Sequence, residues 1–297
     1  MNLDTHTMSV RSFSRTVLCL FAMTTLSMTT LADNPKPSAT ETALRLNGEG
    51  VALLAKGDTE GGLAKLKEAL KADPGCAEAA RNVAKLAFAG QRFELAEKVL
   101  SDALALHPGD KSLLVPFAQT EAKIGNKEGF ANAIDQLKGT CDAEALSSLS
   151  LLLMAQGNPV EADAAVDEAI ALDEHNAEAC FNKGVIAEAG GNLADALTCY
   201  ERSVRHDPKF SRGWINLGNV QDKLGRPDDA IASYEKAIAL DKNDPFAQFN
   251  LGRVLVQGRR DIDRGMSLLV AAAENKEKTP ATRAAVLFLS DLLKASK

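Results

Sequence analysis

The sequence predicts an all-α solenoid, an elongated stack of helical hairpins, on three observations. The chain matches itself when it is shifted by 34 residues, which aligns Gly184 with Gly218. Each unit carries apolar residues at helical spacing. Proline closes several units, as at Pro74, Pro108 and Pro208, where it ends a second helix. One such hairpin cannot bury both of its faces, so neighbouring hairpins must stack.

The composition of the 297-residue chain limits what it is expected to bind. Hydrophobic residues make up 45% and charged residues 25%, as in ordinary globular proteins. Aromatic residues make up only 5%, and the net charge is −6. Nucleic-acid binding requires a basic surface and stacking rings, so the sequence disfavours a nucleic acid. The acidic balance also disfavours an anionic membrane surface and an acidic substrate.

Residues 1–32 predict a secretory signal peptide. Arg11 and Arg15 precede an apolar run that starts at Thr16 and ends at Ala32, before a polar stretch. The run has 17 residues, six of them Thr or Ser, whereas a membrane-spanning helix needs about 20 apolar residues. We therefore expect a periplasmic or secreted bacterial protein with no membrane insertion after cleavage. An uncleaved membrane anchor is the alternative.

The rest of the chain divides into a linker, an array and a cap. Residues 33–42 are predicted to form a polar linker, 43–279 the repeats, and 280–297 a C-terminal capping helix. The predicted repeats are 43–76, 77–110, 111–142, 143–176, 177–210, 211–244 and 245–279. The third repeat departs from the pattern, with Pro116 in its first helix and Phe130 in a slot that is otherwise small. The seventh has one extra residue and Gly265 in that slot.

The sixth unit shows the repeating pattern most fully. Its marker residues are Trp214, Leu217, Gly218, Ala230, Tyr234 and Ala237. They resemble the tetratricopeptide repeat, whose pattern W-x2-L-G-x2-Y…A-x3-F…A…P has the same period. The resemblance implies a right-handed solenoid of about seven helix-turn-helix repeats that binds other proteins. The small pair Gly218 and Ala230 is expected to let the two helices of a repeat approach closely.

The sequence offers little catalytic chemistry. The motifs HExxH, GxSxG and GxGxxG do not occur. His107, His175 and His206 fall in loops between repeats, and we expect them at separate edges of the solenoid. We therefore predict no enzyme activity, no cofactor and no metal site. Chemistry hidden in the diverged repeats is the alternative.

Four cysteines remain after the predicted cleavage, namely Cys76, Cys141, Cys180 and Cys199. No CxxC spacing occurs, so we expect small buried hydrophobic residues rather than ligands or redox groups. A disulfide between Cys180 and Cys199 stays open, because antiparallel helices of one repeat bring these positions near each other.

The face of each first helix opposite the buried stripe is the predicted binding surface. Asn182, Asn216 and Asn250 occupy one position of three consecutive repeats, and an asparagine amide can pair with both groups of a peptide backbone. In the tetratricopeptide repeat family this face lines a concave groove. The predicted groove residues are Asn182, Asn216, Asn250, Asn219, Arg253, Arg212, Phe181, Ile215 and Phe249. Asparagine is common at this position whether or not a peptide binds, so a purely structural role is the alternative.

The family's basic clamp for a C-terminal carboxylate is matched only in part. Arg81, Asn82 and Lys85 fit it, but Ser112 and Pro116 stand where basic residues are required. We therefore predict a non-catalytic scaffold or adaptor, exported to the cell envelope, that binds an extended peptide or partner protein in its groove. The alternative is a subunit of a polysaccharide or pilus export apparatus that uses its edges or convex surface.

Overall fold

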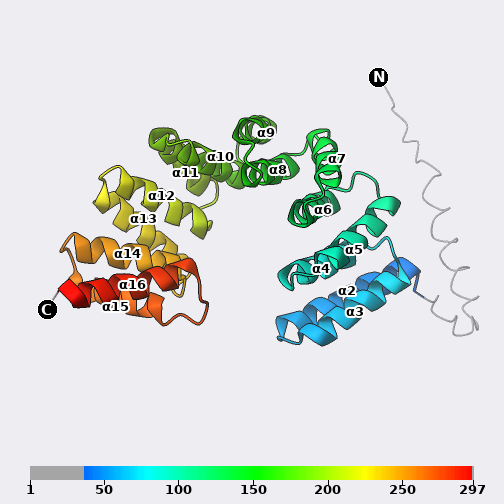
Figure 1. The fold of residues 1–297 in the computed structure, drawn as a ribbon, viewed down its shortest axis with the longest axis horizontal. Helices are drawn as coiled ribbons and strands as arrows, with labels where there is room; N and C mark the ends of the chain where they lie inside the picture. Colours follow the sequence, from blue (N-terminus) through cyan, green and yellow to red (C-terminus); the bar gives the residue numbers. More distant parts are fainter. Residues whose placement is uncertain (1–36, 296–297) are drawn as a thin grey trace, which may run out of the picture.

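The computed structural model describes residues 37–295, and this part of the chain contains fifteen helices and no strand. Seven antiparallel helix pairs and a last helix stack along an arc (Figure 1). The predicted all-α solenoid is therefore confirmed. The predicted signal peptide lies outside the described residues.

The helices follow one another in a regular order. The first helices of the pairs are α2 (Ala39–Ala55), α4 (Ala77–Ala89), α6 (Lys111–Ile124), α8 (Ala143–Ala155), α10 (Ala177–Ala189), α12 (Ser211–Lys223) and α14 (Pro245–Gln257). The second helices are α3 (Thr59–Ala72), α5 (Phe93–Leu106), α7 (Lys127–Lys138), α9 (Pro159–Leu172), α11 (Leu193–His206), α13 (Pro227–Leu240) and α15 (Ile262–Ala273). The last helix is α16 (Pro280–Ala295).

The first helix begins earlier than the sequence predicts. α2 starts at Ala39, inside the predicted linker 33–42, because Ser38 and Glu41 form a capping box. The Ser38 hydroxyl accepts from the Glu41 amide at 3.1 Å, and the Glu41 carboxylate accepts from the Ser38 amide at 2.7 Å. These bonds satisfy backbone donors that the start of a helix leaves unpaired.

The turn inside most helix pairs is made at a glycine with positive φ, whereas Gln91 and Arg259 take this conformation in the second and seventh pairs. Gly191 has a φ of 80° and Gly225 a φ of 73°, each just after the first helix of its pair. This left-handed conformation is open to glycine at little steric cost. The chain can therefore reverse within a few residues and pack the second helix against the first.

The interior of each pair is filled by residues of both helices. Tyr200 and Tyr234, on the second helices α11 and α13, are fully buried. A Cβ atom added to Gly184 would lie 2.6 Å from Tyr200 Cε1, and one added to Gly218 would lie 2.5 Å from Tyr234 Cε1. The Tyr234 ring thus packs over Gly218, so the glycine is needed to make room for the tyrosine as well as for the approach of the two helices.

Two backbones meet directly in the last pair. A Cβ atom on Gly252 would lie 2.8 Å from the carbonyl oxygen of Gly265. The glycine in the small-residue slot of the seventh repeat therefore allows α14 and α15 to approach more closely than side chains would permit.

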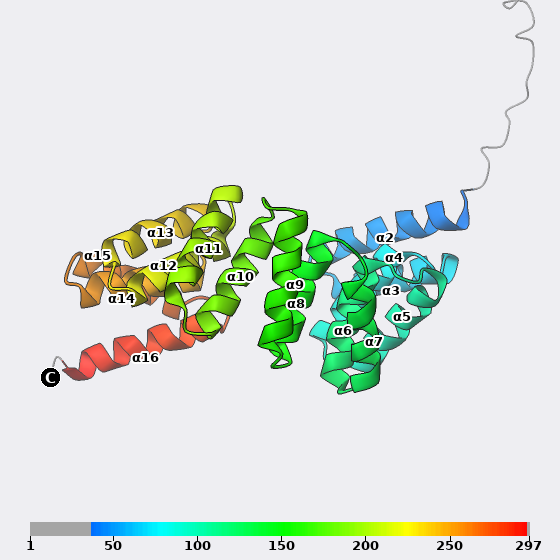
Figure 2. The ribbon, with the colours of Figure 1, turned by 90° about the horizontal axis from the view of Figure 1, so that it is seen from above.

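Each helix contacts only its near neighbours along the described chain. Figure 2 shows the stack from above, with α8 and α9 between α2–α7 and α11–α16. The contact between α7 and α8 is the thinnest between a second helix and the following first helix in residues 37–295. The buried hydrophobic cluster from Leu114 to Ile186 nevertheless continues across this junction, so the third and fourth repeats remain packed together.

Candidate functional site

The inner surface of the arc is the candidate binding surface. α6 and α8 lie on the inner side of the arc relative to α7 and α9 (Figure 1). The predicted groove residues are carried by the first helices α10, α12 and α14. Their exposure divides them into a buried set and a surface set.

The buried set holds consecutive repeats together. Asn182 is 1% exposed, and its amide donates to the Ser147 carbonyl at 3.1 Å and to the Ser147 hydroxyl at 2.9 Å. Phe181 and Ile215 are each 7% exposed. The structure thus differs from the predicted open groove at these three positions, because the neighbouring repeat packs over them.

The surface set forms a connected polar strip on α12 and α14. Asn219 Oδ1 accepts from Asn250 Nδ2 at 3.0 Å and from the Tyr234 hydroxyl at 2.9 Å. Arg253 donates to Asp222 at 2.6 Å and to Gln257 at 3.0 Å. Asn216, Asn219, Asn250 and Arg253 are all partly exposed. We call these four residues the polar strip. The hydrogen bonds just described fix the orientation of Asn219, Asn250 and Arg253 before any ligand binds.

The tyrosines beneath the strip are held in the neutral form. Burial raises the pKa of Tyr200 and Tyr234 above the ordinary value, and Glu188 raises that of Tyr200 further. The Tyr200 hydroxyl donates to Glu188 at 2.8 Å. Both tyrosine hydroxyls therefore stay protonated at neutral pH and act as hydrogen-bond donors.

Arg212 and Phe249 flank the strip. The Arg212 guanidinium lies 5.6 Å from the centre of the Phe181 ring and 5.2 Å from that of Phe210, at cation–π distance. Phe249 is partly exposed and meets Phe288 of α16 edge-on, with ring centres 6.4 Å apart. Both predicted groove residues are therefore present at the surface.

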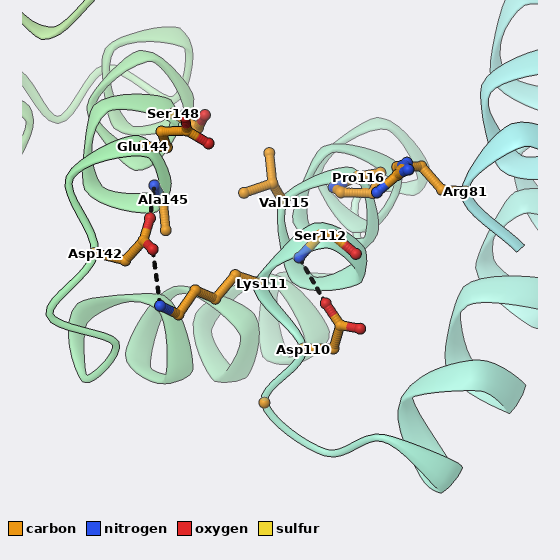
Figure 3. Close-up of a pocket in the computed structure, with 11 residues that line it drawn as sticks. Arg81, Asp110, Lys111, Ser112, Val115, Pro116, Asp142, Glu144, Ala145 and Ser148 are labelled. Atoms are coloured by element: carbon orange, nitrogen blue, oxygen red, sulfur yellow. Dashed lines mark hydrogen bonds and ion pairs between the residues drawn. The ribbon is translucent and has the colours of Figure 1, made fainter. Parts of the chain in front are cut away.

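A further inner cleft lies over α4, α6 and α8 and has a volume of about 630 Å³ (Figure 3). Its walls include Arg81, Val115, Pro116, Glu144 and Ser148. The partial match to the basic clamp pointed to Arg81, Ser112 and Pro116 but not to the residues of α8, and Pro116 takes the place that asparagine holds in other repeats.

An ion pair closes the base of this cleft. Lys111 Nζ lies 2.8 Å from Asp142 Oδ2 (Figure 3). The hydrogen bond from Lys111 lowers the pKa of Asp142, with help from the Ala145 amide. The pair joins the start of α6 to the residue that caps α8.

No group of three or more His, Cys, Asp or Glu side chains within residues 37–295 has the arrangement of a metal site. No described helix is long and apolar enough to span a membrane.

Cys76, Cys141, Cys180 and Cys199 are free thiols. His175 and His206 do lie together, with ring centres 4.9 Å apart, which corrects the expectation that the histidines occupy separate edges.

Comparison with known families decides the classification. Profiles described as tetratricopeptide repeat match residues 47–111, 148–209 and 211–244, together more than half of the chain. The chain belongs to the tetratricopeptide repeat family. Proteins of this family generally mediate protein–protein interactions, and the fold is typically a non-catalytic scaffold.

Solved structures show the same fold at low sequence identity. A tetratricopeptide repeat protein from Parabacteroides merdae is 16% identical, with a TM-score of 0.58, and the match covers 82% of this chain and 97% of that one. Yeast Tom70 is 16% identical with a TM-score of 0.69, covering 87% and 55%. Human IFIT1, in a dimer with PPP-AAAA, is 16% identical with a TM-score of 0.66, covering 86% and 64%. No curated protein matches this tetratricopeptide repeat chain significantly in sequence.

Proposed function

We propose that this tetratricopeptide repeat protein is a non-catalytic adaptor that binds an extended segment of a partner protein on its inner surface. The polar strip carries the proposal. Asn219 Oδ1 already accepts hydrogen bonds from two donors. Asn219 Nδ2 and Asn250 Oδ1 have no hydrogen-bond partner among the described residues. An extended backbone offers the acceptors and donors that match these groups.

Affinity measurements on paired variants test the proposal. A partner that copurifies with the tagged protein from cell-envelope extract is identified, purified and titrated calorimetrically. The double variant Asn216→Ala/Asn250→Ala should weaken binding by roughly tenfold, because each lost hydrogen bond costs about 0.5–1.5 kcal/mol.

Asn182→Ala is the matched control. It removes two inter-repeat hydrogen bonds from a buried side chain. It should therefore lower the unfolding temperature while the folded protein keeps its affinity. Unchanged affinity in the folded double variant would instead assign the interaction to another surface.

We further propose that the adaptor works in the cell envelope, in the periplasm or outside the cell. The leader-like pattern of residues 1–32 supports this location. N-terminal sequencing of the protein from fractionated cells should find a start at or near Asp33. A soluble cytoplasmic pool that retains residues 8–32 would contradict the proposal.

One observation favours the alternative, a subunit of a polysaccharide or pilus export apparatus that binds through its edge. An open pocket of about 630 Å³ lies at the turn of the fourth repeat, lined by Met154, Pro159, Val160 and Ile186. Val160 is 82% exposed, so an apolar side chain of a partner could cover it. Loss of partner binding in Val160→Glu, with full binding in the Asn216/Asn250 variant, would establish this edge as the working surface.

A further inference from the structure

Two loops near the C-terminal end of the array enclose an acidic pocket. The loop between α13 and α14 and the loop between α15 and α16 line a volume of about 640 Å³. The lining contains four carboxylates, Asp241, Asp244, Glu274 and Glu277, and one cation, Lys276. None of the four carboxylates forms an ion pair with a residue of the described chain. The pocket therefore has an excess of negative charge.

Two helix ends add to this negative potential. Asp241 is the C-terminal cap residue of α13, and Glu274 is that of α15. The last carbonyl groups of a helix carry a partial negative charge, which favours a cation beside them. Asp244 differs, because it caps the start of α14 and accepts from two backbone amides of that helix. The carboxylates of Glu274 and Glu277 accept no hydrogen bond from a described residue, so both are available to a ligand.

A buried amide in the wall of the pocket lacks one hydrogen-bond partner. Gln248 lines the pocket and is only 7% exposed. Its Nε2 donates to the Lys242 carbonyl at 2.8 Å, whereas its Oε1 has no partner among the described residues. A buried acceptor without a partner costs free energy, which a donor from a ligand would recover. The pocket therefore offers a neutral acceptor as well as carboxylates, and both favour a ligand with N–H donors.

Gln248 takes the place that a larger side chain holds in the preceding repeat. Trp214 stands 34 residues earlier, and its Nε1 donates to the Pro208 carbonyl, six residues before it, at 3.0 Å. Gln248 makes the corresponding bond to Lys242, also six residues before it. The glutamine thus keeps the hydrogen bond but fills less space than an indole ring, which leaves room in this repeat for a ligand.

An aromatic ring completes the wall. Phe246 lines the pocket and is 40% exposed. A guanidinium group stacks on aromatic rings and presents five N–H donors in one plane, whereas an ammonium group has three donors and is more strongly hydrated. No three His, Cys, Asp or Glu side chains of the described chain have the arrangement of a metal site. Carboxylates, a neutral acceptor and a ring together therefore fit arginine best.

We propose that this pocket binds an arginine side chain of a partner protein. The guanidinium donates to the carboxylates of Glu274 and Glu277 and to the Gln248 amide, and it stacks against the Phe246 ring. The net charge of −6 also favours a basic partner. The inference rests on the proposed adaptor function, and it adds a contact outside the polar strip together with the chemistry of the side chain that makes it.

Titration with a blocked arginine tests the inference. Nα-acetyl-arginine amide is added to isotope-labelled protein, and nuclear magnetic resonance follows the Gln248 side-chain amide and the backbone amides of residues 274–277. These signals should shift to saturation, and the affinity should fall with added salt because ions screen the charges. Nα-acetyl-citrulline amide has nearly the same shape without the charge and should leave the signals nearly unchanged. Equal responses to the two compounds overturn the inference.

Removal of the carboxylate charges locates the binding. Glu274→Gln/Glu277→Gln should weaken arginine binding roughly fivefold or more, because charge-assisted hydrogen bonds are lost. Glu94→Gln/Glu128→Gln is the matched control, because it changes the net charge equally at exposed residues of α5 and α7. It should leave the affinity for arginine unchanged. Equal affinities of the two double variants overturn the inference.

A second variant closes the pocket without removing a charge. Gln248→Trp introduces the side chain of the preceding repeat, which can keep a hydrogen bond to the Lys242 carbonyl while it fills the space. It should abolish the response to arginine, and circular dichroism confirms that it is folded. A folded Gln248→Trp protein that binds arginine as the wild type does contradicts the inference. Saturable binding of calcium chloride with no response to arginine would do so as well.

The outcomes separate this inference from the proposed function, because the arginine titration requires no partner protein. If arginine does not bind, but partner affinity still depends on Asn216 and Asn250, the adaptor function stands and the arginine pocket is removed. If partner affinity depends on Glu274 and Glu277 but not on the polar strip, the pocket stands and binding on the inner surface is removed.

Discussion

Gly218 and Gly48 show how differently two helical glycines can be constrained. A Cβ atom on Gly218 meets the Tyr234 ring at 2.5 Å, whereas one on Gly48 has nothing within 4 Å. We expect Gly218→Ala to lower the free energy of unfolding by about 1–3 kcal/mol through overpacking. Gly48→Ala should raise it by up to about 1 kcal/mol, because alanine is the better helix former. Thermal unfolding of both variants measures the difference, and a shift in the same direction would refute the packing argument.

Glu121 is a buried carboxyl group on α6. It is fully buried in α6, and neither carboxylate oxygen has a partner of good hydrogen-bond geometry, although the Asn126 side chain is close enough to interact with it. A Cβ atom on Gly129 would clash with it, so glycine at the start of α7 makes room for the carboxylate. Burial raises the pKa of Glu121 above 4.5, and Glu97 raises it further, while Asn126 offsets part of the change.

This raised pKa predicts a stability that depends on pH. The folded state holds the Glu121 proton more tightly than the unfolded state, so ionisation destabilises the fold as pH rises above the ordinary pKa of 4.5. Glu121→Gln should therefore add about 1–2 kcal/mol to the free energy of unfolding at neutral pH. The gain should shrink as the pH falls toward 4.5, where the unfolded-state carboxyl also becomes protonated.

Denaturant unfolding at several pH values checks this prediction. Glu128→Gln, an exposed position on α7, is the control and should leave stability nearly unchanged. A gain that is independent of pH would show that shape rather than charge is responsible.

At the scale of the helix, α6 continues through Pro116 without a backbone hydrogen bond at that point. Pro116→Ala restores an N–H donor for the Ser112 carbonyl. It should stabilise the protein by about 1–3 kcal/mol, which thermal unfolding measures. Pro159→Ala at the first position of α9 is the matched control, because that N–H has no helical acceptor. Equal effects at both prolines would show that α6 accommodates Pro116 at no cost.

At the scale of the molecule, stability is a sum over neighbouring repeats. The thin junction between α7 and α8 is bridged by two ion pairs, Lys111 with Asp142 at 2.8 Å and Lys138 with Glu161 at 3.0 Å. All four side chains are at least one-third exposed, so salt screens them. Added salt should therefore weaken the contact between the third and fourth repeats.

Limited proteolysis tests this prediction. Cleavage between residues 139 and 142 should increase with added salt, and the fragments should correspond to α2–α7 and α8–α16. Cys141 within this loop has a φ of 48°, a conformation that disfavours a non-glycine residue. Cleavage between residues 139 and 142 that does not change with salt would contradict the prediction.

Periodicity in the sequence determined the helical architecture, because the period of 34 residues and the apolar stripes depend only on local order along the chain. The surface residues of the candidate site were found in the same way, as Asn216, Asn250 and Arg253 show. Contacts between repeats are not encoded in that periodicity. Only the tertiary structure could therefore decide that the Asn182 amide is hydrogen-bonded to Ser147 and that the Tyr234 ring packs over Gly218. It also decided that the Glu274 and Glu277 carboxylates have no basic partner in the described chain, since pairing depends on which side chains the stacking brings within reach.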